Sequence, residues 1–168
     1  EVNRIRDDLQ AGRISGDQAV DADGGLGNDS FVFAAGATVS SITGSLGIDT
    51  FDLGAYTSAV DLVLSPLVSS GILGFDGSTT GTPNPVGVTF AGVDLIIGGS
   101  ATDSLTGLDG PTNWRVDEIS NQYTDVTTGN SLTFTDIESL NGGSDADAFA
   151  VLGSQTANLS GGSGDDSI

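Results

Sequence analysis

The chain contains no cysteine, methionine or histidine, and its only basic residues are four arginines. Without cysteine and histidine it has no disulfide, zinc site or haem ligation, and no imidazole for acid–base chemistry. No run of about 18 apolar residues occurs, so we expect no membrane insertion. Carboxylates, hydroxyls and the backbone itself are therefore the main functional groups available.

Positive charge is scarce, whereas acidic charge is abundant. The 168 residues include 23 acidic and 4 basic side chains, for a formal net charge of −19. A chain this acidic repels nucleic acid, so no nucleic-acid partner is expected. Twenty of the acids are aspartates and three are glutamates. Because aspartate favours turns and binds hard cations, whereas glutamate favours helices, this bias predicts a chain rich in turns.

A glycine- and aspartate-rich block recurs along the chain. The five copies are GGLGNDSF (24–31), GSLGIDTF (44–51), GGSATDSL (98–105), GGSDADAF (142–149) and GGSGDDSI (161–168). The first two copies start 20 residues apart and the last two start 19 apart. Self-similarity at such a period is typical of proteins built from stacked coils.

Two longer repeats contain these blocks. Residues 88–105 align with 132–149 at a shift of 44, and residues 24–51 align with 142–168 at a shift of 118, then 117. We therefore expect a partial preceding repeat or cap in 1–23, one long unit in 24–141, and the start of the next unit in 142–168. For residues 1–14 an amphipathic helix, with Val2, Ile5 and Leu9 on one face, is the alternative.

These repeats predict an all-β fold, a parallel β-helix (β-solenoid) with a right-handed coil of about 20 residues. In the strand after the first block, Phe31 and Phe33 should point inward, because side chains alternate along a strand. Stacked coils would place Phe31 over Phe51, and Phe149 over Ile168. Residues 69–87, which include Pro83 and Pro85, are expected to form a loop or irregular coil that protrudes from the rod.

The residues also resemble known families. GGLGNDSFVF (24–33) resembles the nine-residue calcium-binding repeat of RTX (haemolysin-type) proteins. Residues 47–65, 90–114 and 134–151 together are similar to the tandem repeats of very large bacterial surface and filament adhesins. This resemblance implies a secreted, cell-surface protein in which the chain is a structural repeat of an adhesin, filament or extracellular matrix. Its partners would be neighbouring repeats of the same chain, or other copies end to end.

The RTX resemblance also implies calcium, in a module that folds on secretion. The implied ligands are Asn28, Asp29, Asp49, Asp147, Asp165 and Asp166. The alternative is a set of structural corners, in which glycine supplies a positive φ and aspartate bonds its own turn. The spacing of 19–20 residues, against 18 for two RTX repeats, favours the corners, and both interpretations stay open.

Catalysis is not expected, since lysine and histidine are absent and only Asp117 and Glu118, near Arg115, form a charged cluster of catalytic type. A carbohydrate-binding or carbohydrate-active β-helix, with surface glycans as partners, is a further alternative. Trp114 would then be a sugar-stacking platform, although a tryptophan filling the core is the commoner situation. Tyr56 and Tyr123 are expected at the surface or at corners.

Overall fold

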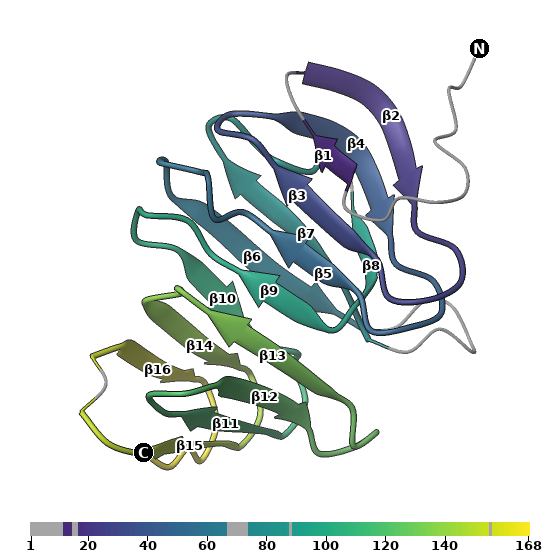
Figure 1. The fold of residues 1–168 in the computed structure, drawn as a ribbon. Coiled ribbons are helices and arrows are strands. Elements are labelled where there is room, and N and C mark those ends of the chain that lie inside the picture. The colour runs from purple at the N-terminus through teal and green to yellow at the C-terminus, as the bar shows by residue number, and fades with distance from the viewer. Residues whose placement is uncertain (1–11, 15–16, 67–73, 88, 155) are drawn as a thin grey trace.

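The computed structural model describes residues 12–14, 17–66, 74–87, 89–154 and 156–168. Within these ranges the expected all-β fold is confirmed: there are sixteen strands in two mixed sheets, and no helix (Figure 1). The described residues accordingly include no helix that is long and apolar enough to cross a membrane. Of residues 1–14, for which a helix and a partial repeat were the alternatives, the structure describes only 12–14, which form a strand.

Each sheet has eight strands. Sheet A has the order β16 (Asn158–Gly162), β14 (Ser139–Gly143), β10 (Ser104–Thr106), β6 (Val60–Ser65), β7 (Phe75–Gly81), β8 (Phe90–Val93), β4 (Thr38–Thr43) and β2 (Asp17–Asp23). Sheet B has the order β1 (Gly12–Ile14), β3 (Ser30–Phe33), β5 (Thr50–Asp52), β9 (Leu95–Ile97), β13 (Ser131–Thr135), β12 (Asn121–Asp125), β11 (Thr112–Val116) and β15 (Asp147–Val151).

Most neighbouring strands are parallel, and the pairs β3–β5 and β14–β16 join equivalent positions of the repeated blocks. β3 and β5 pair with Phe31 opposite Phe51, as expected. Phe31 and Phe33 are buried, whereas Ser30 and Val32, which alternate with them, are half-buried, so the predicted inward and outward alternation is confirmed. At the other end, Ala148 pairs with Ser167, which sets the register expected for Phe149 and Ile168.

The prediction that all strands pair in parallel, however, is wrong in two places. β6, β7 and β8 form an antiparallel meander in sheet A, and β11, β12 and β13 form one in sheet B. The expectation of a protruding loop at 69–87 is therefore wrong for 75–81, which is β7, between β6 and β8. Small residues are required there, because a Cβ on Gly77 would lie 2.3 Å from the Phe90 ring.

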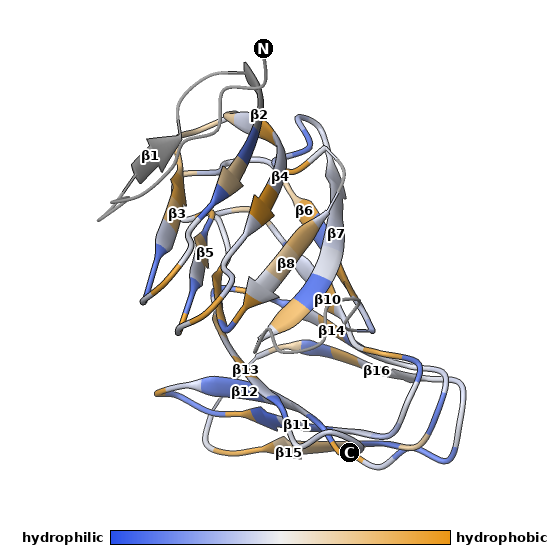
Figure 2. Ribbon diagram, turned by 90° about the vertical axis from the view of Figure 1, so that its right-hand side faces the viewer, coloured by the Kyte–Doolittle hydropathy of each residue, from blue (hydrophilic) through white to orange (hydrophobic). Residues whose placement is uncertain are grey.

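The two sheets face each other and share one apolar core (Figure 2). Aromatic rings join them: the Phe51 and Phe90 centroids lie 5.7 Å apart, and those of Phe75 and Tyr123 lie 5.3 Å apart. The surface alternative for the two tyrosines is wrong, since both are buried. The corner alternative fits Tyr56, which lies between β5 in sheet B and β6 in sheet A, whereas Tyr123 lies within β12. Their hydroxyls reach backbone groups instead: Tyr56 donates to the Ala37 carbonyl, and Tyr123 accepts from the Leu108 N–H.

The longer sequence repeats correspond to defined positions in the two sheets. Strands that are equivalent in the 44-residue repeat belong to different sheets: β8 and β10 lie in sheet A, whereas their counterparts β13 and β15 lie in sheet B. Strands that are equivalent in the repeat of about 118 residues belong to the same sheet: β3 and β15 both lie in sheet B, and β4 and β16 both lie in sheet A. One long unit therefore holds two meanders, one in each sheet.

Candidate functional site

The repeated blocks form corners that carry the chain from one sheet to the other; we call them Gly-Asp corners. They comprise residues 24–29, 44–49, 98–103, 142–147 and 161–166. In each corner the carboxyl of the final aspartate folds back over the first glycine. A Cβ on Gly44 would lie 2.5 Å from Asp49 Oδ2, and one on Gly161 would lie 2.1 Å from Asp166 Oδ2. Glycine is thus required because the carboxylate occupies the place of a side chain.

The first two corners bring together three of the predicted ligands. The Asp29 N–H donates to Asp49 Oδ1 at 2.8 Å, and the Ile48 N–H donates to Asn28 Oδ1 at 2.9 Å. The Gly27 N–H also donates to the Leu46 carbonyl at 2.8 Å. The polar groups of Asn28 and Asp49 therefore bind the backbone of the neighbouring corner.

The last two corners repeat this arrangement at the opposite end of the sheets. The Asp147 N–H donates to Asp166 Oδ1 at 3.0 Å. Asp147 Oδ1 accepts from the Thr112 N–H at 3.0 Å and from its hydroxyl. Asp165, the remaining predicted ligand, is exposed. The six predicted residues therefore form two separate groups instead of one site.

Two further carboxylates, for which the sequence predicted no role, accept hydrogen bonds from the corners. The Asp49 N–H donates to Asp94 Oδ2 at 2.9 Å, and the Asp103 N–H donates to Glu138 Oε2 at 2.9 Å. We call residues 90–96 and 134–140 the capping segments. The signal was present in the 44-residue repeat, which aligns Asp94 with Glu138 and thus keeps an acid at this position.

Burial of the corner aspartates dominates their electrostatics. Asp49 and Asp103 are 0% exposed and Asp147 is 2% exposed. Burial raises the pKa of Asp49, with the charges of Asp29 and Asp94 adding to the effect and the hydrogen bond from the Asp29 N–H opposing it. Burial likewise raises the pKa of Asp29, Asp94, Asp103 and Asp147.

One oxygen of several corner carboxylates has no partner. Oδ2 of Asp29, Asp49 and Asp147 is buried without a hydrogen bond. Yet the described part of the chain contains no group of three or more acidic side chains arranged to hold a metal ion. The chemistry that these contacts perform is the satisfaction of backbone N–H groups at the corners.

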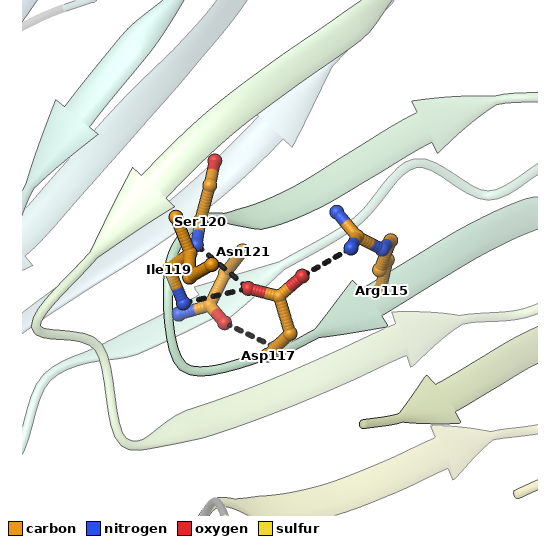
Figure 3. A network of polar contacts seen from close by, with 5 residues as sticks. All are labelled: Arg115, Asp117, Ile119, Ser120 and Asn121. Atoms are coloured by element: carbon orange, nitrogen blue, oxygen red, sulfur yellow. Dashed lines mark hydrogen bonds and ion pairs between the residues drawn. The ribbon is translucent and has the colours of Figure 1, made fainter. Parts of the chain in front are cut away.

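The charged cluster at 115–118 closes a turn (Figure 3). Asp117 pairs with the Arg115 guanidinium and accepts from the Ile119 N–H at 2.8 Å and the Ser120 N–H at 2.7 Å. The bonds from Ser120 and Ile119, and then the Arg115 charge, hold the pKa of Asp117 below its ordinary value. Glu118 instead accepts from the Ser154 N–H at 3.1 Å. The two carboxylates therefore bind different loops.

Trp114, from the same strand as Arg115, lies in the core. Its ring stacks on Phe149 with centroids 5.4 Å apart and also contacts Tyr123. Above it, a shallow surface depression of about 230 Å³ is lined in part by Asn113, Arg115 and Gln122. A stacking platform at Trp114 is thus wrong, because the residue is only 1% exposed.

In comparisons with protein-family models, curated proteins and solved structures, nothing matches this chain.

Proposed function

We propose that the chain is a structural repeat module of a large secreted bacterial adhesin, filament or extracellular-matrix protein, in which it forms a stiff, acidic β-solenoid rod. The observation that carries this proposal is the stacking of Gly-Asp corners, in which the carboxylate of one corner accepts the N–H of the corner before it. Each layer is stabilised by the next, as in repeat proteins generally. The secreted setting comes from the resemblance of the motifs to adhesin repeats.

The positions of the meanders support a straight rod. From β3 to β15 sheet B advances by six strands, and from β4 to β16 sheet A also advances by six. A meander in one sheet alone would lengthen that side and bend the stack. Because each unit places one meander in each sheet, both sides lengthen equally. The net charge of −19 would also keep neighbouring rods apart.

Small-angle scattering on the chain, and on a version with residues 24–141 duplicated in tandem, tests the proposal. Six strand spacings amount to about 29 Å. The duplicated chain should therefore be longer by about that distance at unchanged cross-section. A duplicated chain that grows in all dimensions, as a compact globule does, would rule out the rod.

A calcium-binding, RTX-like module that folds on secretion is the second candidate. The buried, unpartnered oxygens of Asp29, Asp49 and Asp147 favour it, since a cation would neutralise them. Titration calorimetry and circular dichroism of chelator-treated protein decide the matter. Calcium binding should release heat and increase the β signal, and the absence of both at millimolar Ca²⁺ would exclude it.

A carbohydrate-binding or carbohydrate-active β-helix is the third candidate. The depression beside Arg115 favours it, because guanidinium and carboxamide groups bind sugar hydroxyls and carboxylates. A glycan array screened with the chain and with Arg115→Ala tests it. Binding that Arg115→Ala abolishes would support this candidate, and an array without binding would exclude it.

A further inference from the structure

The last Gly-Asp corner repeats the second one, yet its surroundings differ. At a shift of 117 residues, Leu159, Asp166 and Ile168 are the counterparts of Ile42, Asp49 and Phe51. The three earlier residues are 1%, 0% and 0% exposed, respectively. Ile168, in contrast, is 75% exposed, and Asp166 and Leu159 are only half-buried. In the described structure, residues of core type are therefore left uncovered at this position.

A capping segment buries the earlier set. Phe90 pairs with Ile42, and Ile96 pairs with Phe51. Between these two contacts, the Asp94 carboxylate accepts the Asp49 N–H at 2.9 Å. Two apolar contacts and one charge-assisted hydrogen bond therefore seal the corner.

The second capping segment covers the corner 98–103 in the same way, so the arrangement occurs twice in this chain. In both segments the residue two after the phenylalanine has a positive φ: 64° at Gly92 and 54° at Asp136. Its carbonyl then lies over the first glycine of the corner. A Cβ would lie 2.2 Å from the Gly92 oxygen at Gly44, and 1.8 Å from the Asp136 oxygen at Gly98.

The corner 161–166 has every feature that such a segment requires. Gly161 keeps the glycine over which the carbonyl passes. β15 and β16 are the last strands of their sheets, so one edge of each is unpaired, apart from the single bridge at Ser167. Within the described residues the Asp166 N–H makes no hydrogen bond, although the N–H of its counterpart Asp49 is capped.

We propose that the face formed by Leu159, Gly161, Asp166 and Ile168 docks a segment of the pattern Phe-x-(Gly/Asp)-(Val/Ile)-(Asp/Glu), supplied by a further copy of this repeat. The phenylalanine packs on Leu159, the acid accepts the Asp166 N–H, and the apolar residue two positions after the acid covers Ile168. This inference rests on the proposed function, because only a stack of layers presents such an end.

The direction of the hydrogen bonds makes this docking directional, so that the two ends of the stack differ. Four bonds run from the backbone N–H of a corner aspartate to a side-chain carboxylate: from Asp29 to Asp49, from Asp49 to Asp94, from Asp103 to Glu138, and from Asp147 to Asp166. In these four bonds from a backbone N–H to a carboxylate, the donor precedes the acceptor in sequence. The end at Asp166 therefore offers a donor and selects a partner that brings a carboxylate.

The test extends the full chain after Ile168 with a Gly/Ser linker of about 15 residues, which spans about 20 Å, and a second copy of residues 88–98. Tethering supplies the segment at about millimolar effective concentration. Amide hydrogen exchange is followed by NMR at Leu159, Gly161 and Asp166. Exchange of the Asp166 amide should slow at least about tenfold relative to the unextended chain. The matched control carries Asp94→Ala in the appended copy only and should lose the slowing at Asp166.

Two results would overturn the docking: no slowing with the native segment, or equal slowing with the Asp94→Ala segment. The amides of Asp29 and Asp49 report separately on the stacked fold. If they are protected while Asp166 does not respond, the docking fails and the proposed function stands. If they exchange freely, the proposed function fails as well.

Discussion

Asp94 and Asp49, 45 residues apart, bind each other through reciprocal groups. The Asp49 N–H donates to the Asp94 carboxylate at 2.9 Å, and the Asp94 N–H donates to the Asp49 carbonyl at 2.9 Å. Glu138 and Asp103 repeat the relationship, with the second bond at 3.3 Å. Because Asp49 and Asp103 are fully buried, their backbone N–H groups depend on these acids for an acceptor.

Asp94→Ala should therefore lower the free energy of unfolding by about 1–3 kcal/mol, the cost of leaving a buried N–H without an acceptor. Urea denaturation followed by circular dichroism measures it. Asp109→Ala, at an exposed position, is the matched control and should change the stability by less than about 0.5 kcal/mol. Equal effects of the two substitutions would show that only net charge matters.

Periodicity and residue identity made part of this structure predictable. The blocks at 24–31 and 44–51 match position by position, so stacking Phe31 on Phe51 was the arrangement that buried both rings. The role of Asp94 was not predictable from composition, because an acid between two apolar residues has the appearance of an ordinary surface position. Only the pairing with Asp49 explains it.

The strand β7 illustrates a second limit. Its sequence, FDGSTTG, has the composition of a turn, and two prolines follow it closely. The fold nevertheless packs Gly77 against the Phe90 ring and buries Thr79, whose hydroxyl bonds Asn84 at 2.6 Å and Val86. Tertiary packing overrides the local preference there, and no single-residue signal distinguishes such a strand from a loop.

Trp114→Ala should lower the free energy of unfolding by about 3–5 kcal/mol, because it leaves a cavity among Phe149, Tyr123 and Phe134. It also removes the bond from the indole N–H to Thr112, at 2.9 Å. Chemical denaturation is again the measurement. Ile119→Ala, at a side chain that is 92% exposed, serves as the control and should leave the midpoint unchanged. A small loss for Trp114→Ala would contradict its placement in the core.

Gly44→Ala should destabilise the protein by at least about 2 kcal/mol. The added methyl would lie 2.2 Å from the Gly92 oxygen and 2.5 Å from Asp49 Oδ2, and the backbone oxygen cannot rotate away. Gly110→Ala provides the contrast, since nothing lies within 4 Å of its Cβ and its φ is not positive. That change should be neutral or stabilise by up to about 1 kcal/mol. Thermal unfolding of both variants distinguishes backbone contact from loss of glycine flexibility.

The buried aspartates should make the protein more stable in mild acid than at pH 8. Burial raises the folded-state pKa of Asp29, Asp49, Asp94, Asp103 and Asp147 above the ordinary value of about 4. Above these raised values the five carboxylates are charged in the folded state, and the burial of that charge costs stability. As the pH falls through the raised values, the folded state takes up protons before the unfolded state does, so the stability increases. The gain is complete only once the pH lies below the unfolded value.

Asp49→Asn isolates this effect at one residue. The amide keeps an oxygen for the Asp29 N–H and puts an NH₂ group where Oδ2 has no partner, while it removes the buried charge. The variant should melt about 2–4 °C higher than the parent at pH 8, which corresponds to about 1 kcal/mol, and the difference should shrink towards pH 4. Scanning calorimetry across this range measures both. A variant that is destabilised at pH 8 would mean that the charge itself holds the corner together, as a bound cation would require.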